Sequence, residues 1–394
     1  MVPKGWEKRD LHGLITIKHG FAFKSEYFSN DGKYVLLTPG SFNESGGFRN
    51  QGPKTKFYNG PIPNGYLLSK GDLLLAMTEQ AEGLLGSPLF VPEDNKYLHN
   101  QRLGLVEINC PDKICSDFLY LFFNHEDSRK QITEQSTGTK VKHTSPDRLC
   151  SVIGLVPSFL EQKKIAQTLS TWDKAISMTE NLLTNSQQQK KALMQQLLTG
   201  NKRLLDENGV RFNGKWEKKH LSDVADVYQP KTISQSMMSD SGYPVYGANG
   251  VIGFYQEFNH ETEQIAVTCR GSTCGIVNWT QAKSWITGNA MVINTDNYSY
   301  VSKKFLFYTL NGSDLKYLIS GSGQPQITGN IKTHIINLPC IEEQQKIAAV
   351  LSAADAEIST LEKKIACLKD EKKALMQQLL TGKRRVKVDE AVAA

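Results

Sequence analysis

The sequence predicts an α+β fold: two β-rich, mixed globular domains separated by two long helices, which pack as an antiparallel coiled coil with pseudo-twofold symmetry. Residues 157–200 align without a gap to residues 339–382, and 23 of these 44 pairs are identical. Both copies carry the apolar spacing of a coiled coil. The segments before them are rich in glycine and aromatic residues and contain short β-type runs.

Length and composition narrow the class of protein. A chain of 394 residues is longer than most single domains, and 39% hydrophobic with 22% charged residues is typical of globular proteins. The net charge of +6 permits polyanion binding without demonstrating it. The first residues lack the pattern of a secretory signal and the seven cysteines are scattered, so we expect a cytoplasmic protein with reduced thiols.

The chain divides in the order globule, helix, globule, helix. We expect a first domain at 1–156, a central helix at 157–200, a second domain at 201–338, a C-terminal helix at 339–382 and a flexible, basic then acidic tail at 383–394. The two globular segments are related, because the Trp6-Glu7-Lys8 start of the first resembles Trp216-Glu217-Lys218 in the second.

The second repeat has a nearly continuous apolar seam. Alternating steps of four and three join Ile347, Leu351, Ala354, Ile358, Leu361, Ile365, Leu368, Leu375 and Leu379, with Lys372 as the one polar member. The first repeat keeps this register but places Thr179, Ser186 and Lys190 at seam positions, which predicts weaker packing in its middle.

Helix end signals agree with this interpretation. Ser158 and Glu161 form a capping-box pattern directly after Pro157, and Gly200 and Gly382 stand where a left-handed C-terminal cap belongs. Each helix of roughly 40 residues is about 60 Å long, which is longer than an ordinary globular helix. We do not expect such an amphipathic helix to stand alone in water, so the other copy is the natural partner. Such a pair would act as a ruler that holds two heads at a fixed spacing.

With these features the chain resembles the specificity subunits of type I restriction-modification systems. The resemblance covers almost the whole chain and is carried by the paired helix entries, which share Pro, Glu-Gln and Ile-Ala at the same spacing, and by the motifs "YPVYGANGVIGF", "CRGSTCG", "GSGQPQIT" and "HNQRLGLV". It implies that each globule is a target recognition domain reading one half of a bipartite, asymmetric site in double-stranded DNA.

The resemblance also implies a division of labour. Two modification subunits would dock on the helices and methylate adenine with S-adenosylmethionine, and separate restriction subunits would translocate and cut with ATP and Mg. This chain would then hold no cofactor and no catalytic or metal-binding residue. The sequence agrees, because it lacks an amino-methyltransferase motif, a phosphate loop and a nuclease carboxylate cluster.

Polar residues in glycine-rich loops are the candidates for DNA contact, because Arg, Lys, Asn and Gln present paired groups to base edges. In the first domain these are Lys24, Thr78, Gln101, Arg102, Thr139, Lys140 and Lys142. In the second they are Lys231, Tyr246, Asn249, Arg270, Ser272, Gln324 and Gln326. For each of them an exposed loop residue without a function is an equal alternative.

The repeated helix surfaces are the candidates for partner docking, because two identical partners need the same surface twice. The predicted residues are Glu161, Gln162, Lys164, Met194 and Gln195 in the first repeat and Glu343, Gln344, Lys346, Met376 and Gln377 in the second. Two other classes of protein stay open: a coiled-coil scaffold with two β-rich heads that bind polysaccharide or serve structure, and an enzyme that itself modifies DNA.

Overall fold

The computed structural model describes residues 2–138, 141–321 and 324–388 and divides into two compact units. The first unit contains the residues up to Met178 together with those from Ile365 onward, and the second contains Thr179–Lys364. Each unit therefore contains the start of one long helix and the end of the other. No helix in the described part of the chain has the length and apolar character needed to cross a membrane.

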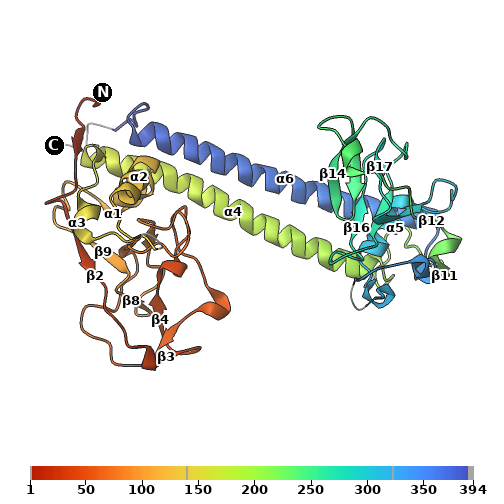
Figure 1. The fold of residues 1–394 in the computed structure, drawn as a ribbon, viewed down its shortest axis with the longest axis horizontal. Helices are drawn as coiled ribbons and strands as arrows, with labels where there is room; N and C mark the ends of the chain where they lie inside the picture. Colours follow the sequence, from red (N-terminus) through yellow and green to blue (C-terminus); the bar gives the residue numbers. More distant parts are fainter. Residues whose placement is uncertain (1, 139–140, 322–323, 389–394) are drawn as a thin grey trace. The chain divides into compact units, whose positions relative to one another are not determined.

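The first unit contains three sheets and three short helices. Its two-stranded sheet pairs β1 with β10, and its four-stranded sheets have the orders β2-β9-β6-β7 and β3-β5-β4-β8. The strands are β1 (Glu7–Arg9), β2 (Ile15–His19), β3 (Phe28–Ser29), β4 (Tyr34–Leu37), β5 (Phe57–Tyr58), β6 (Leu73–Ala76), β7 (Pro88–Phe90), β8 (Tyr97–His99), β9 (Leu103–Ile108) and β10 (Gly154–Val156). The helices are α1 (Ser116–Asn124), α2 (Glu126–Glu134) and α3 (Pro146–Cys150), of which α1 lies against the start of α4 (Phe159–Leu197) (Figure 1).

The second unit repeats the two-stranded sheet and one of the four-stranded sheets, and its third sheet has three strands. A two-stranded sheet pairs β11 with β19, a four-stranded sheet has the order β12-β18-β15-β16, and a three-stranded sheet has the order β14-β13-β17 (Figure 1). The strands are β11 (Glu217–His220), β12 (Asp226–Tyr228), β13 (Tyr243–Gly247), β14 (Gly250–Tyr255), β15 (Ile265–Thr268), β16 (Val277–Trp279), β17 (Trp285–Ile286), β18 (Ala290–Asn294) and β19 (Ile335–Leu338). Its α-helices are the last part of α4, the helix α5 (Lys303–Asn311) and the first part of α6 (Ile341–Leu380).

The kinship of the two globular segments is closer than the sequence comparison indicated. The 3₁₀ turns at Ser25–Tyr27 and Gln235–Met237 are separated by the same 210 positions as Trp6 and Trp216. In both units a strand after this turn, β4 in the first and β13 in the second, pairs in parallel with a later strand, β8 or β17. Since the same pairing recurs in divergent sequence, the common fold is specified by buried positions rather than by the loops.

The predicted coiled-coil register is confirmed. All ten seam positions of α6 and all ten equivalent positions of α4 are buried or half-buried, including Thr179 and Ser186. The Ser186 hydroxyl donates to the Glu357 carboxylate over 3.0 Å, so this polar seam position is satisfied across the helix pair.

The helices run antiparallel within each unit. In the first unit Asp173 of α4 pairs with Lys372 of α6, and the equivalent pair in the second unit is Lys190 with Asp355, with 2.5 Å between Nζ and Oδ1 in both. The ion pair is the same in both units, but in the first unit α4 supplies the aspartate and α6 the lysine, and in the second unit α6 supplies the aspartate and α4 the lysine. The repeated sequence therefore builds the same contact twice.

The predicted helix ends are also observed. The Ser158 hydroxyl accepts from the Glu161 backbone N–H over 3.4 Å, and Gly200 and Gly382 have φ angles of +73° and +68°. The Glu161 side chain, however, binds Trp6 and Arg385. The hydrophobic core of each unit continues into the helix pair: Ile165 and Leu169 join it in the first unit, and Ile347 and Leu351 in the second.

Candidate nucleic-acid and partner interfaces

Most candidate DNA-contact residues of the second unit gather on one surface, which we term the second loop surface. It consists of the β13–β14 turn, the loop 269–275 after β15, and the described residues 320–321 and 324–326, which we term the second hairpin. The Thr268 hydroxyl donates to the carbonyl of Ala248, which ties the β13–β14 turn to the end of β15. The Gly271 N–H donates to the Pro325 carbonyl over 3.0 Å, which ties the loop to the hairpin.

The first unit has an equivalent surface, the first loop surface, built from the end of β6, the residues before β9 and the described residues 137–138 and 141–143, which we term the first hairpin. The Met77 N–H donates to the Arg102 carbonyl, and the Thr144 N–H donates to the Met77 carbonyl, both over 3.0 Å. The Glu79 N–H donates to the Lys142 carbonyl over 2.9 Å. Four of the predicted residues, Thr78, Gln101, Arg102 and Lys142, belong to these segments.

The two hairpins correspond in structure, although their sequences match only loosely. In each, the end residues exchange two backbone hydrogen bonds: Thr137 with His143 in the first unit, and Ser320 with Gln326 in the second. His143 then bridges to Thr78, and Gln326 bridges to Arg270. The candidates from the two units therefore occupy equivalent places, which sequence comparison could not establish.

The predicted DNA-contact residues differ in how far their side chains are exposed to solvent. Seven are exposed and belong to the two loop surfaces: Gln101, Arg102, Asn249, Arg270, Ser272, Gln324 and Gln326. Thr78 and Tyr246 are buried, since the Thr78 hydroxyl bonds His143 and the Tyr246 hydroxyl accepts from the Gln281 N–H over 3.1 Å. Both side chains hold the loops in place and are not presented to a ligand.

The remaining candidates lie at the margins or beyond the described chain. Lys142 pairs with Glu79 over 3.6 Å, and exposed Lys24 pairs with Glu26 over 3.6 Å. Exposed Lys231 is held through its carbonyl, which accepts from the Trp285 indole over 3.3 Å. Thr139 and Lys140 fall outside the described residues.

Burial excludes catalytic use for one histidine close to these loops. His99 is fully buried, its Nε2 lies 2.9 Å from the Leu103 carbonyl, and burial lowers its pKa to about 4. The ring is neutral at physiological pH and packs as a buried side chain. Among the described residues no group of three His, Cys, Asp or Glu is arranged to hold a metal ion.

Each unit has an equivalent cluster of a tryptophan, a glutamate and an arginine at the start of its long helix, which we term a clasp. In the first clasp (Trp6, Glu161 and Arg385) the indole N–H donates to Glu161 over 2.9 Å and Arg385 donates over 2.7 Å. In the second clasp (Trp216, Glu343 and Arg203) these distances are 3.1 Å and 2.5 Å. Hydrogen bonding to Glu343 raises the pKa of Arg203.

Glutamines beside the clasps fix the short helices. Gln162 accepts from the N–H of Cys115, the residue before α1, over 3.2 Å, and Gln344 accepts from the N–H of Ser302, the residue before α5, over 2.8 Å. Both amides also donate to the proline carbonyl that precedes their helix. Glu161, Gln162, Glu343 and Gln344 are thus buried and used within the units, and we leave them out of the docking surface for which they were predicted.

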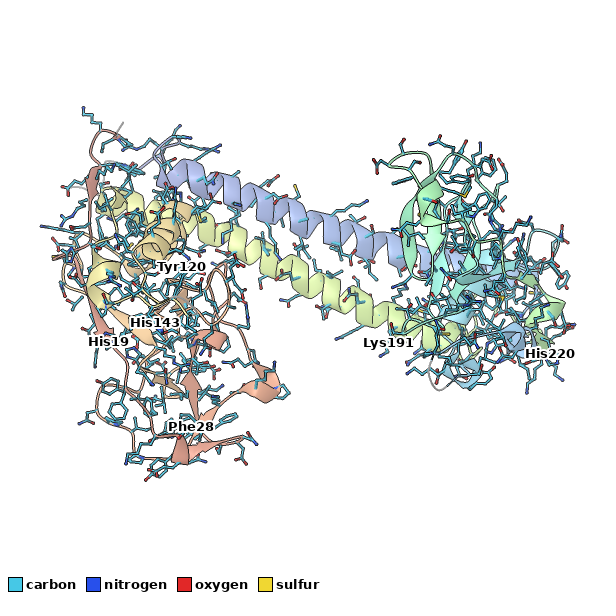
Figure 2. The ribbon with its side chains drawn as sticks, in the orientation of Figure 1. His19, Phe28, Tyr120, His143, Lys191 and His220 are labelled. Atoms are coloured by element: carbon cyan, nitrogen blue, oxygen red, sulfur yellow. The ribbon has the colours of Figure 1, made fainter. Side chains whose placement is uncertain are left out.

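The other predicted docking residues lie at equivalent solvent-facing places. Gln195 and Gln377 are exposed, Met194 and Met376 half-buried, Lys164 exposed and Lys346 half-buried. Lys191 next to them is also exposed, as Figure 2 shows. In the first unit Gln377 and Lys373 contact Glu126 over 3.0 and 3.2 Å.

A groove lies beside each of these helix ends. One groove of about 820 Å³ is lined by Met194, Gln195, Leu198, Thr199 and Ile335, among others. The groove of the first unit, about 680 Å³, is lined by Leu380, Thr381 and Ile153, which stand 182 positions from Leu198, Thr199 and Ile335. Ile153 and Ile335 are 48% and 55% exposed, so both grooves present a large apolar side chain to solvent.

Comparisons with known proteins agree with this geometry. The family model for the type I restriction modification DNA specificity domain matches residues 3–185 and 213–369. The chain is 25% identical to the Type I restriction enzyme MjaVIII specificity subunit of Methanocaldococcus jannaschii over 316 residues, 72% of this chain and 74% of that protein. It is also 25% identical to the putative MjaX specificity subunit of the same organism over 362 residues, 82% of this chain and 80% of that protein.

Solved structures show the same fold. The S subunit of a type I restriction-modification system from M. genitalium aligns with a TM-score of 0.65 at 16% identity, covering 95% of this chain and 96% of that chain. A structure titled for complex assembly and conformational transition of the type I R-M system aligns with a TM-score of 0.58, covering 98% and 100%.

Proposed function

The chain belongs to the family of type I restriction-modification DNA specificity domains, and we propose that each of its two units reads one half of a bipartite, asymmetric DNA site. As a specificity subunit it serves DNA recognition and works with the other subunits of such a system. The observation that carries the proposal is the pair of equivalent loop surfaces, which share a backbone framework but differ in exposed side chains.

Reading one half-site per unit follows from this combination. A common framework presents loops in the same way twice, and side chains that differ between the frameworks distinguish different base sequences. The first loop surface exposes Gln101 and Arg102, and the second exposes Asn249, Arg270 and Gln326. Arg donates two hydrogen bonds to guanine, and Asn or Gln forms a similar pair with adenine.

A binding experiment tests this function. The chain, assembled with its modification partner, should bind one duplex sequence at least about a thousandfold more tightly than bulk DNA, with affinity falling steeply as salt rises. Arg270→Ala should weaken binding to that duplex by about 1 to 3 kcal/mol and leave bulk binding nearly unchanged. The matched control is Arg211→Ala, an exposed arginine in the linker after α4. Equal affinity for all duplexes would refute DNA specificity.

The helix ends are the proposed seats for two identical modification subunits. Buried identities between the repeats follow from packing alone, but Lys191, Ala192, Gln195 and Gln196 are exposed and identical to their equivalents 182 positions later. A shared ligand explains identity at exposed positions, and the equivalent grooves beside these residues supply the apolar part of such a seat.

Subunit counting tests this docking proposal. In native mass spectrometry, Ile335→Asp or Ile153→Asp alone should lower the number of bound modification subunits from two to one, and the double variant should bind none. Val210→Asp, which changes a 59% exposed residue in the linker, serves as the control. Two subunits bound to the double variant would exclude the grooves as docking sites.

A further inference from the structure

The second unit carries an exposed apolar ribbon on strands β13 and β14. Strands β13 and β14 form an antiparallel hairpin whose last pair is Gly247 with Gly250, so that Ala248 and Asn249 make the two-residue turn. Three of the six residues of β14 are large, apolar and exposed to solvent: Val251 at 48%, Ile252 at 49% and Phe254 at 37%.

This exposure has no explanation in the packing of the unit. Val245 on the facing strand is fully buried, so the core side of the hairpin is complete without the exposed residues of β14. Alternation along β14 is also broken, because the register shifts between Val245 and Tyr246 and leaves both Val251 and Ile252 outside. Single exposed apolar residues are ordinary, but several on one strand indicate a binding surface.

The equivalent part of the first unit follows a different path. Counting 210 positions back from Ala248 and Asn249 leads to Thr38 and Pro39, where the chain enters a 3₁₀ turn, Pro39–Ser41. Ser41 in this turn is buried and accepts from the Gln51 side chain over 2.7 Å. If two units share a backbone framework but read different half-sites, the segments that differ between them carry the difference in specificity. The ribbon of β13 and β14 is one of these segments.

The position of the ribbon identifies its ligand. The bond from Thr268 to Ala248 places the turn beside the start of the loop that carries Arg270, and Arg270 bridges to Gln326. The apolar residues therefore continue the polar surface that we assign to base recognition. A two-stranded ribbon fits the major groove, where the only apolar group on a base edge is the C5-methyl of thymine.

We propose that Val251 and Ile252 contact thymine methyl groups in the half-site read by the second unit, which makes both residues determinants of sequence specificity. This inference rests on the proposed function, because it assigns A·T pairs to that half-site. Asn249 at the turn complements the contact, since an amide pairs with adenine on the other side of an A·T pair.

Uracil substitution tests the contact, because it removes the methyl group and keeps every hydrogen-bonding group of the base. The assembled complex is titrated with its target duplex and with duplexes in which one thymine at a time is replaced by uracil. We expect about a fourfold loss of affinity per contacted methyl, and all affected thymines in one half-site.

The paired variant Val251→Thr/Ile252→Thr identifies the residues involved. Threonine keeps the β-branched shape at these exposed positions, so thermal stability should not change. The variant should bind the thymine duplex more weakly than the parent, and its uracil penalty should be smaller than the parent's, because each threonine keeps only one of the apolar groups that can reach a thymine methyl. Val210→Thr, the same substitution at an exposed linker residue, should retain the full penalty.

The outcomes separate this inference from the proposed function. The inference is overturned if no thymine shows a penalty, if the paired variant retains the parent's penalty, or if neither half-site holds an A·T pair whose methyl matters. A complex that still selects one duplex over bulk DNA in those cases keeps its proposed function. A complex that selects none loses both.

Discussion

Arg203 grips Glu343 with two nitrogens, Nε at 2.5 Å from Oε1 and Nη2 at 2.7 Å from Oε2, and joins the residues after α4 to the start of α6. Arg385 also binds Glu161 at the start of α4 with two nitrogens, but there Nε and Nη2 both lie 2.7 Å from the one oxygen Oε1. Arg203 and Arg385 are 182 positions apart, as are Glu161 and Glu343, so the duplication built both clasps. Each unit thereby fastens the end of one helix to the start of the other.

Removing the arginine of the second clasp should destabilise its unit strongly. Glu343 is fully buried, so Arg203→Ala leaves an unpaired buried carboxylate and should cost about 3 to 5 kcal/mol in free energy of unfolding. Arg385→Ala should cost less, because the Arg385 side chain is 41% exposed, against 20% for Arg203. Chemical denaturation measures both values.

The control for the clasp is an exposed ion pair on β11. The Lys219 ammonium lies 2.9 Å from the Glu217 carboxylate. The variant Lys219→Ala should leave the free energy of unfolding unchanged, because exposed ion pairs contribute little to it. A loss for Arg203→Ala no larger than that for Lys219→Ala would contradict the role assigned to the clasp.

Stability should fall as the pH drops from 6.5 toward 4. Burial lowers the pKa of His99 to about 4 from an ordinary value of 6.5, so the unfolded chain takes up this proton at a higher pH than the folded chain. Protonation of His99 therefore leaves the free energy of unfolding unchanged above pH 6.5 and lowers it by about 3 kcal/mol once the pH reaches 4. The pKa values of His260 and His334 are lowered by burial as well, which adds in the same direction.

The variant His99→Asn isolates this effect. It lacks the titrating ring, so the difference in unfolding free energy between variant and parent should shift by about 3 kcal/mol between pH 7 and pH 4, in favour of the variant. A constant difference over this range would show that His99 does not titrate as proposed. Denaturant titrations at matched salt supply the values.

Shortening the helix pair should change the gap between half-sites. We expect that deleting residues 183–189 from α4 and the facing residues 354–360 from α6 preserves the seam, because seven residues are one heptad. The helices become about 10 Å shorter, and the preferred gap should decrease by about three base pairs while both half-sequences stay the same. Target mapping by methylation checks this, and an unchanged gap would mean that spacing is set elsewhere.

The sequence predicted the register of the long helices better than it predicted the contacts of individual side chains. The seam register, including polar Thr179 and Ser186, followed from helical period alone, because the period depends only on sequence spacing. The clasps were missed, although extending the repeat by three residues aligns Arg203 with Arg385. An arginine after a helix resembles any basic C-terminal residue until its partner is known.

Tertiary packing decided the rest. Thr78 and Tyr246 lie in loop sequences typical of exposed sites, yet contacts with distant residues bury them. Glu161 and Glu343 are charged, and burial is unusual for such residues unless they are paired. Val251 and Ile252 are exposed although their sequence indicates a core strand, because a register shift changes the face of the strand.

The most direct test of paired reading heads is methylation mapping of a genome in cells that express this chain with its modification subunit. Two recognition units in one chain predict methylated adenines in a single asymmetric motif of two short half-sequences separated by a fixed gap of unspecified bases. Methylation at one continuous motif, or at sites without a common sequence, would contradict the account.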